Sequence, residues 1–104
     1  MSLSLHARKK IELVIDRPHL ERYLRVLEAH GVRGYTVLPA LEGKGSRGAW
    51  RPSRLTNAAN RVLVLAVVDE AKAAEILEDL DVMFDELPGV AFVSDVGVLR
   101  PDRF

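Results

Sequence analysis

The chain has 104 residues, of which 15 are Lys or Arg, 15 are Asp or Glu and none is Cys. This length suffices for one core, so we interpret residues 1–104 as a single domain. Zero net charge gives no general attraction to nucleic acid or anionic lipid. The lack of cysteine excludes disulfides, thiolate metal ligands and a Cys nucleophile. Without a membrane-length apolar stretch or a signal-peptide pattern, we expect a cytoplasmic protein with no membrane insertion.

The first half of the chain predicts a strand, a helix and a second strand. Lys10–Asp16 is rich in strand-forming residues. Pro18 suits the first position of a helix, and Gly31 suits the left-handed residue that ends it. Val32–Leu41 predicts the second strand. The helix between them has apolar residues at helical spacing, namely Leu20, Tyr23, Leu24 and Leu27.

The second half predicts a strand, a helix and a last strand. Arg61–Val68 predicts a strand, and Asp69 is a suitable N-cap for the helix that follows. The break at Leu87-Pro88-Gly89 ends this helix, and Val90–Leu99 predicts the last strand. The apolar stripe of the helix consists of Ala73, Ile76, Leu77, Leu80 and Phe84.

The element order β-α-β-β-α-β predicts an α+β ferredoxin-like fold, with a four-stranded antiparallel sheet and both helices on one face. A strand with one exposed face alternates apolar and polar residues, but Val62–Val68 is apolar throughout. We therefore expect an oligomer that buries the open sheet face. The alternative is that the strand tolerates a few exposed valines.

A long, basic and glycine-rich loop lies between the second and third strands, from about residue 42 to residue 58. No acidic residue occurs between Gly43 and Val68, a stretch whose basic residues are Lys44, Arg47, Arg51, Arg54 and Arg61. Alternating glycines let backbone N–H groups converge on an anion, and Arg side chains add bidentate donors for phosphate or carboxylate. We expect no regular structure over residues 42–57. This motif predicts an anion site, although a solvated hairpin tip fits it equally well.

The remaining polar residues give weaker signals. His6, His19 and His30 are scattered without carboxylate partners, so we expect no metal site. No nucleophile with a matching base can be assembled, so we expect no enzyme activity. An acidic run most simply forms a solvated helix face; it consists of Glu75, Glu78, Asp79, Asp81, Asp85 and Glu86.

Two motifs in this order resemble the PII signal-transduction superfamily. Gly31-Val-Arg-Gly-Tyr-Thr-Val37 is followed, after a short gap, by Gly43-Lys-Gly-Ser-Arg47. In that superfamily a G-x-T-V strand leads into a long T-loop that begins with a G-x-G element. The resemblance covers residues 9–100. It is closest to the PII-like branch, which includes regulators associated with bicarbonate transporters and with carboxysomes.

The resemblance implies a homotrimer that binds adenine nucleotide (ADP, AMP or ATP) in clefts between subunits. It places Gly34, Tyr35, Thr36 and Val37 on the adenine side. It places Gly43, Lys44, Gly45, Ser46 and Arg47 in the T-loop near the phosphates, where the basic pattern adds Arg51. It also implies that Arg100 contacts phosphate and that Gly89 lies beside the nucleotide loop of the family.

Four departures from the family pattern change these expectations. Asp85-Glu-Leu-Pro-Gly89 stands where the family has T-G-x-x-G-D-G, so ADP or AMP becomes as plausible as ATP. The loop lacks the tyrosine that classical members uridylylate and the glutamine that helps bind 2-oxoglutarate. The C-terminal Cys pair of some bicarbonate-transporter regulators is also absent. Bicarbonate, a small anion, would suit the basic loop.

The sequence therefore favours a regulator without catalytic cofactor or metal. It would bind adenine nucleotide with bicarbonate, and would dock through its T-loop on a bicarbonate transporter or a carboxysome component. One alternative is a protein-docking module that binds no small molecule. The other is a phosphate-handling ferredoxin-like enzyme that uses Arg47 or Arg51.

Overall fold

The computed structural model describes residues 3–45, 48–50 and 60–104. The elements are β1 (His6–Asp16), the 3-10 turn η1 (Arg17–His19), α1 (Leu20–Ala29), β2 (Tyr35–Ala40), β3 (Gly43–Gly45), β4 (Gly48–Trp50), β5 (Arg61–Val68), α2 (Glu70–Met83), β6 (Gly89–Val98) and the 3-10 turn η2 (Pro101–Arg103).

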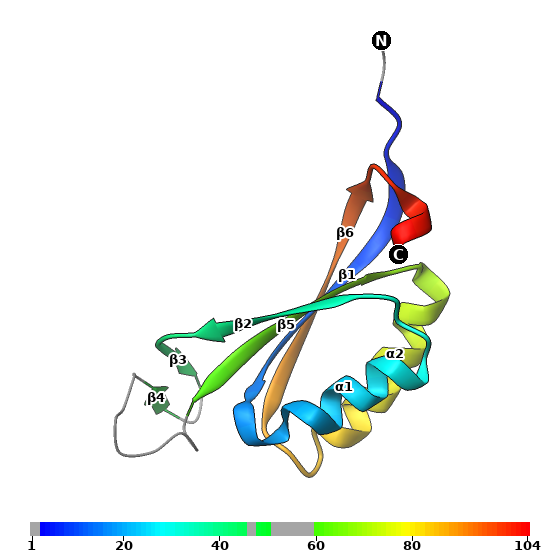
Figure 1. Ribbon diagram of the computed structural model, residues 1–104. Helices are drawn as coiled ribbons and strands as arrows, with labels where there is room; N and C mark the ends of the chain where they lie inside the picture. Colours follow the sequence, from blue (N-terminus) through cyan, green and yellow to red (C-terminus); the bar gives the residue numbers. More distant parts are fainter. Residues whose placement is uncertain (1–2, 46–47, 51–59) are drawn as a thin grey trace.

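Four strands form one antiparallel sheet in the order β2-β5-β1-β6. Both α-helices lie on the same side of this sheet (Figure 1). The predicted ferredoxin-like α+β fold is therefore confirmed. Among the described residues, neither helix is long and apolar enough to cross a membrane.

Three elements begin two or more residues away from their predicted starts. β1 begins at His6 rather than Lys10 because pairing with β6 continues back to His6 and Val98, which overrides the weak strand preference of the polar residues there. β2 begins at Tyr35 rather than Val32. Pro18 lies in η1, so the first turn is 3-10 and α1 starts only at Leu20.

The surroundings of strand β5 explain why its sequence does not alternate between apolar and polar residues. Val62, Val64, Ala66 and Val68 are buried beneath the helices. The residues between them lie on the opposite, open face and are only partly covered. The cross-strand pairing puts further apolar side chains on that open face, namely Val14, Leu38, Val90 and Phe92. Both faces of the central sheet are therefore apolar, and one of them is uncovered in a single chain.

Asp69 caps α2 as predicted, because its Oδ1 accepts a hydrogen bond of 2.7 Å from the Lys72 backbone N–H. Losing such a cap costs about 1 kcal/mol, so Asp69→Ala is expected to lower the free energy of unfolding by that amount. Urea denaturation followed by circular dichroism measures the change. Asp81→Ala is the control, since Asp81 lies inside the helix and caps nothing. An equal loss in both variants would contradict the cap assignment.

Candidate functional site

A concave site of about 380 Å³ lies at the start of β2. The structure brings the predicted residues Gly34, Tyr35 and Thr36 together there. Val37 instead packs against the helix-covered core, so its predicted ligand role stays a prediction. The sequence reasoning missed the other lining residues, which are Lys10, Leu65, Ala66, Val67 and Phe104. They come from three separate segments, and no local motif marks them.

The C-terminal turn closes one side of this site. Phe104 lines it, and the Arg33 guanidinium donates a hydrogen bond to the backbone carbonyl of Asp102, beside the start of β2. The predicted phosphate ligand Arg100 is exposed and directly precedes η2. Arg100 therefore belongs to the same end of the sheet as Gly34.

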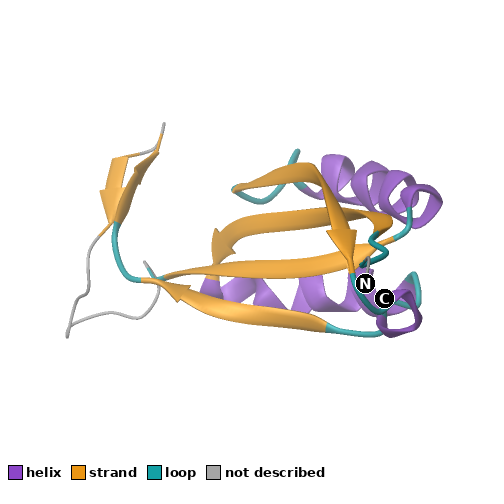
Figure 2. Cartoon of the chain, turned by 90° about the horizontal axis from the view of Figure 1, so that it is seen from above, coloured by secondary structure: helices purple, strands orange, loops and turns teal. Residues whose placement is uncertain are grey.

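The first part of the predicted T-loop forms a short antiparallel hairpin, which is the second part of the candidate site. β3 pairs with β4 through Gly43 with Trp50, Lys44 with Ala49 and Gly45 with Gly48. This hairpin extends away from the main sheet (Figure 2), and the Lys44 side chain is exposed. The predicted ligands Ser46, Arg47 and Arg51 lie outside the described residues.

The expectation of no regular structure over residues 42–57 is therefore wrong for β3 and β4. A strand is recognised in a sequence by the alternation of apolar and polar side chains. Glycine has no side chain, so a glycine-rich strand lacks this signal. Gly43, Gly45 and Gly48 pair through their backbones alone, and only two residues connect the two strands, which favours a hairpin.

Gly89 lies at the same end of the sheet as this hairpin. It pairs with Ile15, which pairs with Val62, which in turn pairs with Pro39 near the end of β2. A Cβ at Gly89 would lie 2.7 Å from Phe84 Cε1 and 3.1 Å from Ile15 Cγ2. Close packing therefore gives this glycine a structural role, and its predicted ligand role stays a prediction.

The described residues that are candidates for nucleotide binding thus form two groups at opposite ends of β2. One group contains Gly34, Tyr35, Thr36 and Arg100, and the other contains Gly43, Lys44, Gly45 and Gly89. The six residues of β2 span roughly 20 Å at the rise of an extended strand. One chain therefore does not bring the two groups together around a single ligand.

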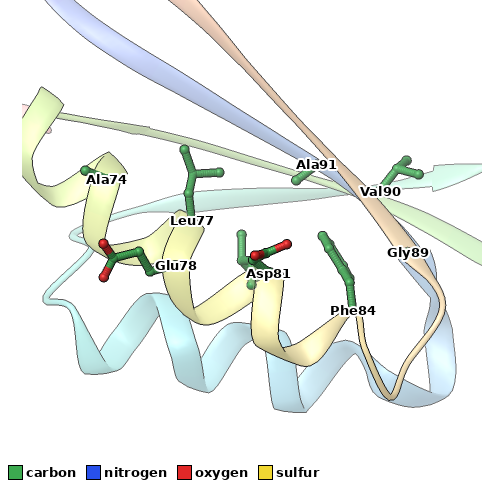
Figure 3. Close-up of a pocket in the computed structure, with 9 residues that line it drawn as sticks. Ala74, Leu77, Glu78, Asp81, Phe84, Gly89, Val90 and Ala91 are labelled. Atoms are coloured by element: carbon green, nitrogen blue, oxygen red, sulfur yellow. The ribbon is translucent and has the colours of Figure 1, made fainter.

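A larger groove of about 640 Å³ runs between α2 and β6, and of the predicted residues only Gly89 lines it (Figure 3). Its rim carries the carboxylates of Glu78 and Asp81. These negative charges would repel phosphate or bicarbonate. We therefore do not assign the groove to an anionic ligand.

The described titratable groups do not assemble a catalytic or metal site. Burial raises the pKa of Tyr23, and the hydrogen bond and charge of Asp95 raise the pKa of Lys9. Neither residue lines the site at β2. In the described ranges, no cluster of three or more His, Cys, Asp or Glu side chains could hold a metal ion.

The expectation that His30 has no carboxylate partner is wrong. Its Nε2 lies 2.6 Å from Asp79 Oδ2, and its Nδ1 lies 3.6 Å from Glu75 Oε2. Both carboxylates belong to α2, far from His30 in sequence, so only the packing of the two helices reveals the pairing. Part of the acidic run is thus tied to α1, while Glu78 and Asp81 remain on the exposed surface.

The chain thus combines a ferredoxin-like fold with a long loop between its second and third main-sheet strands and with candidate binding residues at both ends of the sheet. The model of the nitrogen regulatory protein P-II family matches residues 8–103, so the chain belongs to the PII family. PII proteins are signalling proteins, and trimers are typical of them. No curated protein matches the chain.

Solved structures place the chain near the PII-like branch. CPII, a nitrogen regulatory PII-like protein from Thiomonas intermedia K12 solved with ADP, AMP and bicarbonate, is 32% identical with a TM-score of 0.90, and the match covers 99% of this chain and 98% of CPII. CPII with ADP and bicarbonate gives 32% identity and a TM-score of 0.89, with 99% of each chain covered. A PII-like signalling protein from Thermus thermophilus is 26% identical, with a TM-score of 0.83 and coverage of 98% and 99%.

Proposed function

We propose that this chain forms a homotrimer that binds adenine nucleotide, together with bicarbonate, in the clefts between subunits. Its T-loop would then dock on a target protein of inorganic-carbon uptake or fixation, either a bicarbonate transporter or a carboxysome component. The protein would act in the cytoplasm, in association with carboxysomes where that component is the target. It would regulate without catalysing a reaction.

The observation that carries this proposal is that the candidate binding residues lie at both ends of the sheet rather than at one. In a ring with rotational symmetry, two different surface patches of each subunit contact its two neighbours, so one end of the sheet can face the other end in the next subunit. The concave site at Gly34, Tyr35 and Thr36 of one subunit would then face Lys44 of its neighbour. The apolar floor suits a purine base, while lysine and arginine suit its phosphates.

The ligands of the structural relatives support the choice of nucleotide and anion. CPII has been solved with ADP, AMP and bicarbonate together. This chain lacks the glycine-rich phosphate loop before β6 and has Asp85-Glu-Leu-Pro-Gly89 there, which supplies two carboxylates instead of donors. A ligand with fewer phosphates, AMP or ADP, therefore suits the cleft at least as well as ATP.

Ligand binding would regulate the protein through the charge of its loop. Nucleotide phosphate and bicarbonate would neutralise Lys44, Arg47 and Arg51, and this would change which partner surface the loop can approach. A coupling of about 1–3 kcal/mol would alter partner affinity by roughly 5- to 150-fold.

Calorimetric titration with AMP, ADP and ATP, each with and without bicarbonate, tests the proposal. We expect about one nucleotide bound per subunit, with affinity increased by bicarbonate. Lys44→Ala combined with Arg47→Ala is expected to weaken nucleotide binding at least about 100-fold, because two charge-assisted hydrogen bonds of about 1.5–3 kcal/mol each are lost.

The matched control removes two exposed cations elsewhere, in Arg22→Ala with Arg25→Ala on α1. Unchanged affinity in the loop variant, or an equal loss in the control, would sink the loop assignment. Absence of heat with every nucleotide would favour the protein-docking module, and steady ATP turnover would favour the phosphate-handling enzyme.

A further inference from the structure

The groove between α2 and β6 is a second concave surface, and Gly89 is the one residue that it shares with the described candidates for the proposed nucleotide cleft. Leu77 and Phe84 rise from α2 toward the strand that carries Val90 and Ala91, and Asp81 stands between them (Figure 3). The groove is thus apolar at its floor and anionic at its rim.

The outer edge of β6 runs beside this groove. β6 is the last strand in the sheet order and pairs with β1 on one side only, so among the described residues its other side has no strand partner. Edge strands are commonly protected by Lys, Pro or a short length. β6 has ten residues and contains neither Lys nor Pro, while Val90, Phe92 and Val93 are 50%, 56% and 41% exposed. This edge is therefore open to pairing with another strand.

The negative charge around the groove indicates that a partner segment would be basic. From Ala73 to Leu99 the chain has seven acidic residues and no Lys or Arg. Glu75 and Asp79 are paired with His30, and Asp95 with Lys9. Glu78 and Asp81 have no ion-pair partner in the described part of the chain and are exposed at the rim. A segment with positive charge would complement this surface, whereas an anionic one would be repelled.

We propose that the groove is a docking site for an extended, basic segment of a partner protein that adds a strand to the outer edge of β6. In an added strand, alternate side chains face the helix side of the sheet. A Lys or Arg at those positions would lay its aliphatic stem along Leu77 and Phe84 and bring its charge to Glu78 and Asp81. β-branched residues at the intervening positions would pack beside Val90 and Phe92 on the open face.

A fluorescently labelled, capped peptide of four Lys-Val repeats tests this proposal, because it alternates basic and β-branched residues. We expect saturable binding to the full-length protein with a micromolar Kd, measured by anisotropy, and no binding of the corresponding Glu-Val peptide. Glu78→Lys with Asp81→Lys is expected to weaken binding at least about tenfold. The matched control is Glu21→Lys with Glu28→Lys, which makes the same charge change on the exposed face of α1 and should leave the affinity unchanged.

Hydrogen exchange distinguishes strand pairing from loose charge attraction. The Lys-Val peptide is expected to slow exchange of β6 backbone amides and to leave β2, the opposite edge strand, unaffected. Equal weakening in both charge-reversed variants, or binding without β6 protection, would overturn the proposal. Failure of the Lys-Val peptide to bind while the β6 amides are already protected would show that a second copy of the chain occupies this edge, which also overturns it.

Discussion

Replacing Tyr23 with alanine is expected to lower the free energy of unfolding by about 3–5 kcal/mol, as large-to-small substitutions of buried aromatic residues do. Tyr23 is fully buried, and its ring centroid lies 5.9 Å from that of Phe84. Its hydroxyl donates a long hydrogen bond of 3.5 Å to the carbonyl of Pro88. The side chain thus joins α1 to the end of α2 and to the segment before β6. Since folded domains are stable by about 5–15 kcal/mol, this substitution should remove a large fraction of the free energy of unfolding.

Tyr23→Phe separates the contribution of the ring from that of the hydroxyl. Burial raises the pKa of Tyr23 above its usual value of 10.0, because the folded state disfavours the phenolate. The unfolded chain therefore loses this proton first, and stability should fall as the pH rises above about 10. Tyr23→Phe should be nearly as stable as the parent at pH 7 and should lose less stability between about pH 9 and pH 11. Urea denaturation across this range measures both effects, and identical pH profiles would contradict the assignment.

If the chain forms the proposed trimer, Leu63→Glu is expected to convert it into monomers and to abolish the proposed nucleotide binding. Leu63 lies on the open face of β5, opposite Val14 on β1 and Leu38 on β2. A carboxylate there would have to be buried without a partner if open faces meet, which costs several kcal/mol per subunit. The helix-covered core is untouched, so the monomer should keep its secondary structure. Light scattering reports the mass, and calorimetry reports nucleotide binding.

Leu63→Met is the matched control, because it keeps both volume and polarity and should leave assembly intact. A Leu63→Glu protein that remains trimeric would show that subunits do not meet through this face. A monomer that still binds nucleotide with parental affinity would show instead that one chain holds the complete site.

The fold was predictable from the sequence because its elements depend on local patterns. The apolar spacing of α1 and α2, the cap at Asp69 and the left-handed Gly31, with φ of 72°, are all encoded within a few residues. The unbroken apolar run of β5 even indicated the second apolar face. The start of β1 was not predictable, because its polar residues become a strand only through pairing with β6.

The site was only partly predictable because much of it depends on contacts between distant segments. The motif at Gly34-Tyr-Thr36 located one wall of the concave site, but Lys10 and Phe104 reach it only through the fold. His30 and Asp79 are likewise joined only by helix packing. The short strand β3, Gly-Lys-Gly, has no side-chain alternation to read. Local sequence thus predicted the motifs, and tertiary structure determined which residues join them.

The placement of candidate binding residues at both ends of one sheet has a genetic consequence. In a ring of three, each subunit would contribute a different half to each of two neighbouring clefts. A subunit damaged in both halves would then disable two of the three clefts in a mixed ring, while a subunit damaged in one half would disable one. Two variants with damage in opposite halves, for instance at Tyr35 and at Lys44, would restore one intact cleft when mixed. Co-expressed alleles should therefore show both partial dominance and complementation.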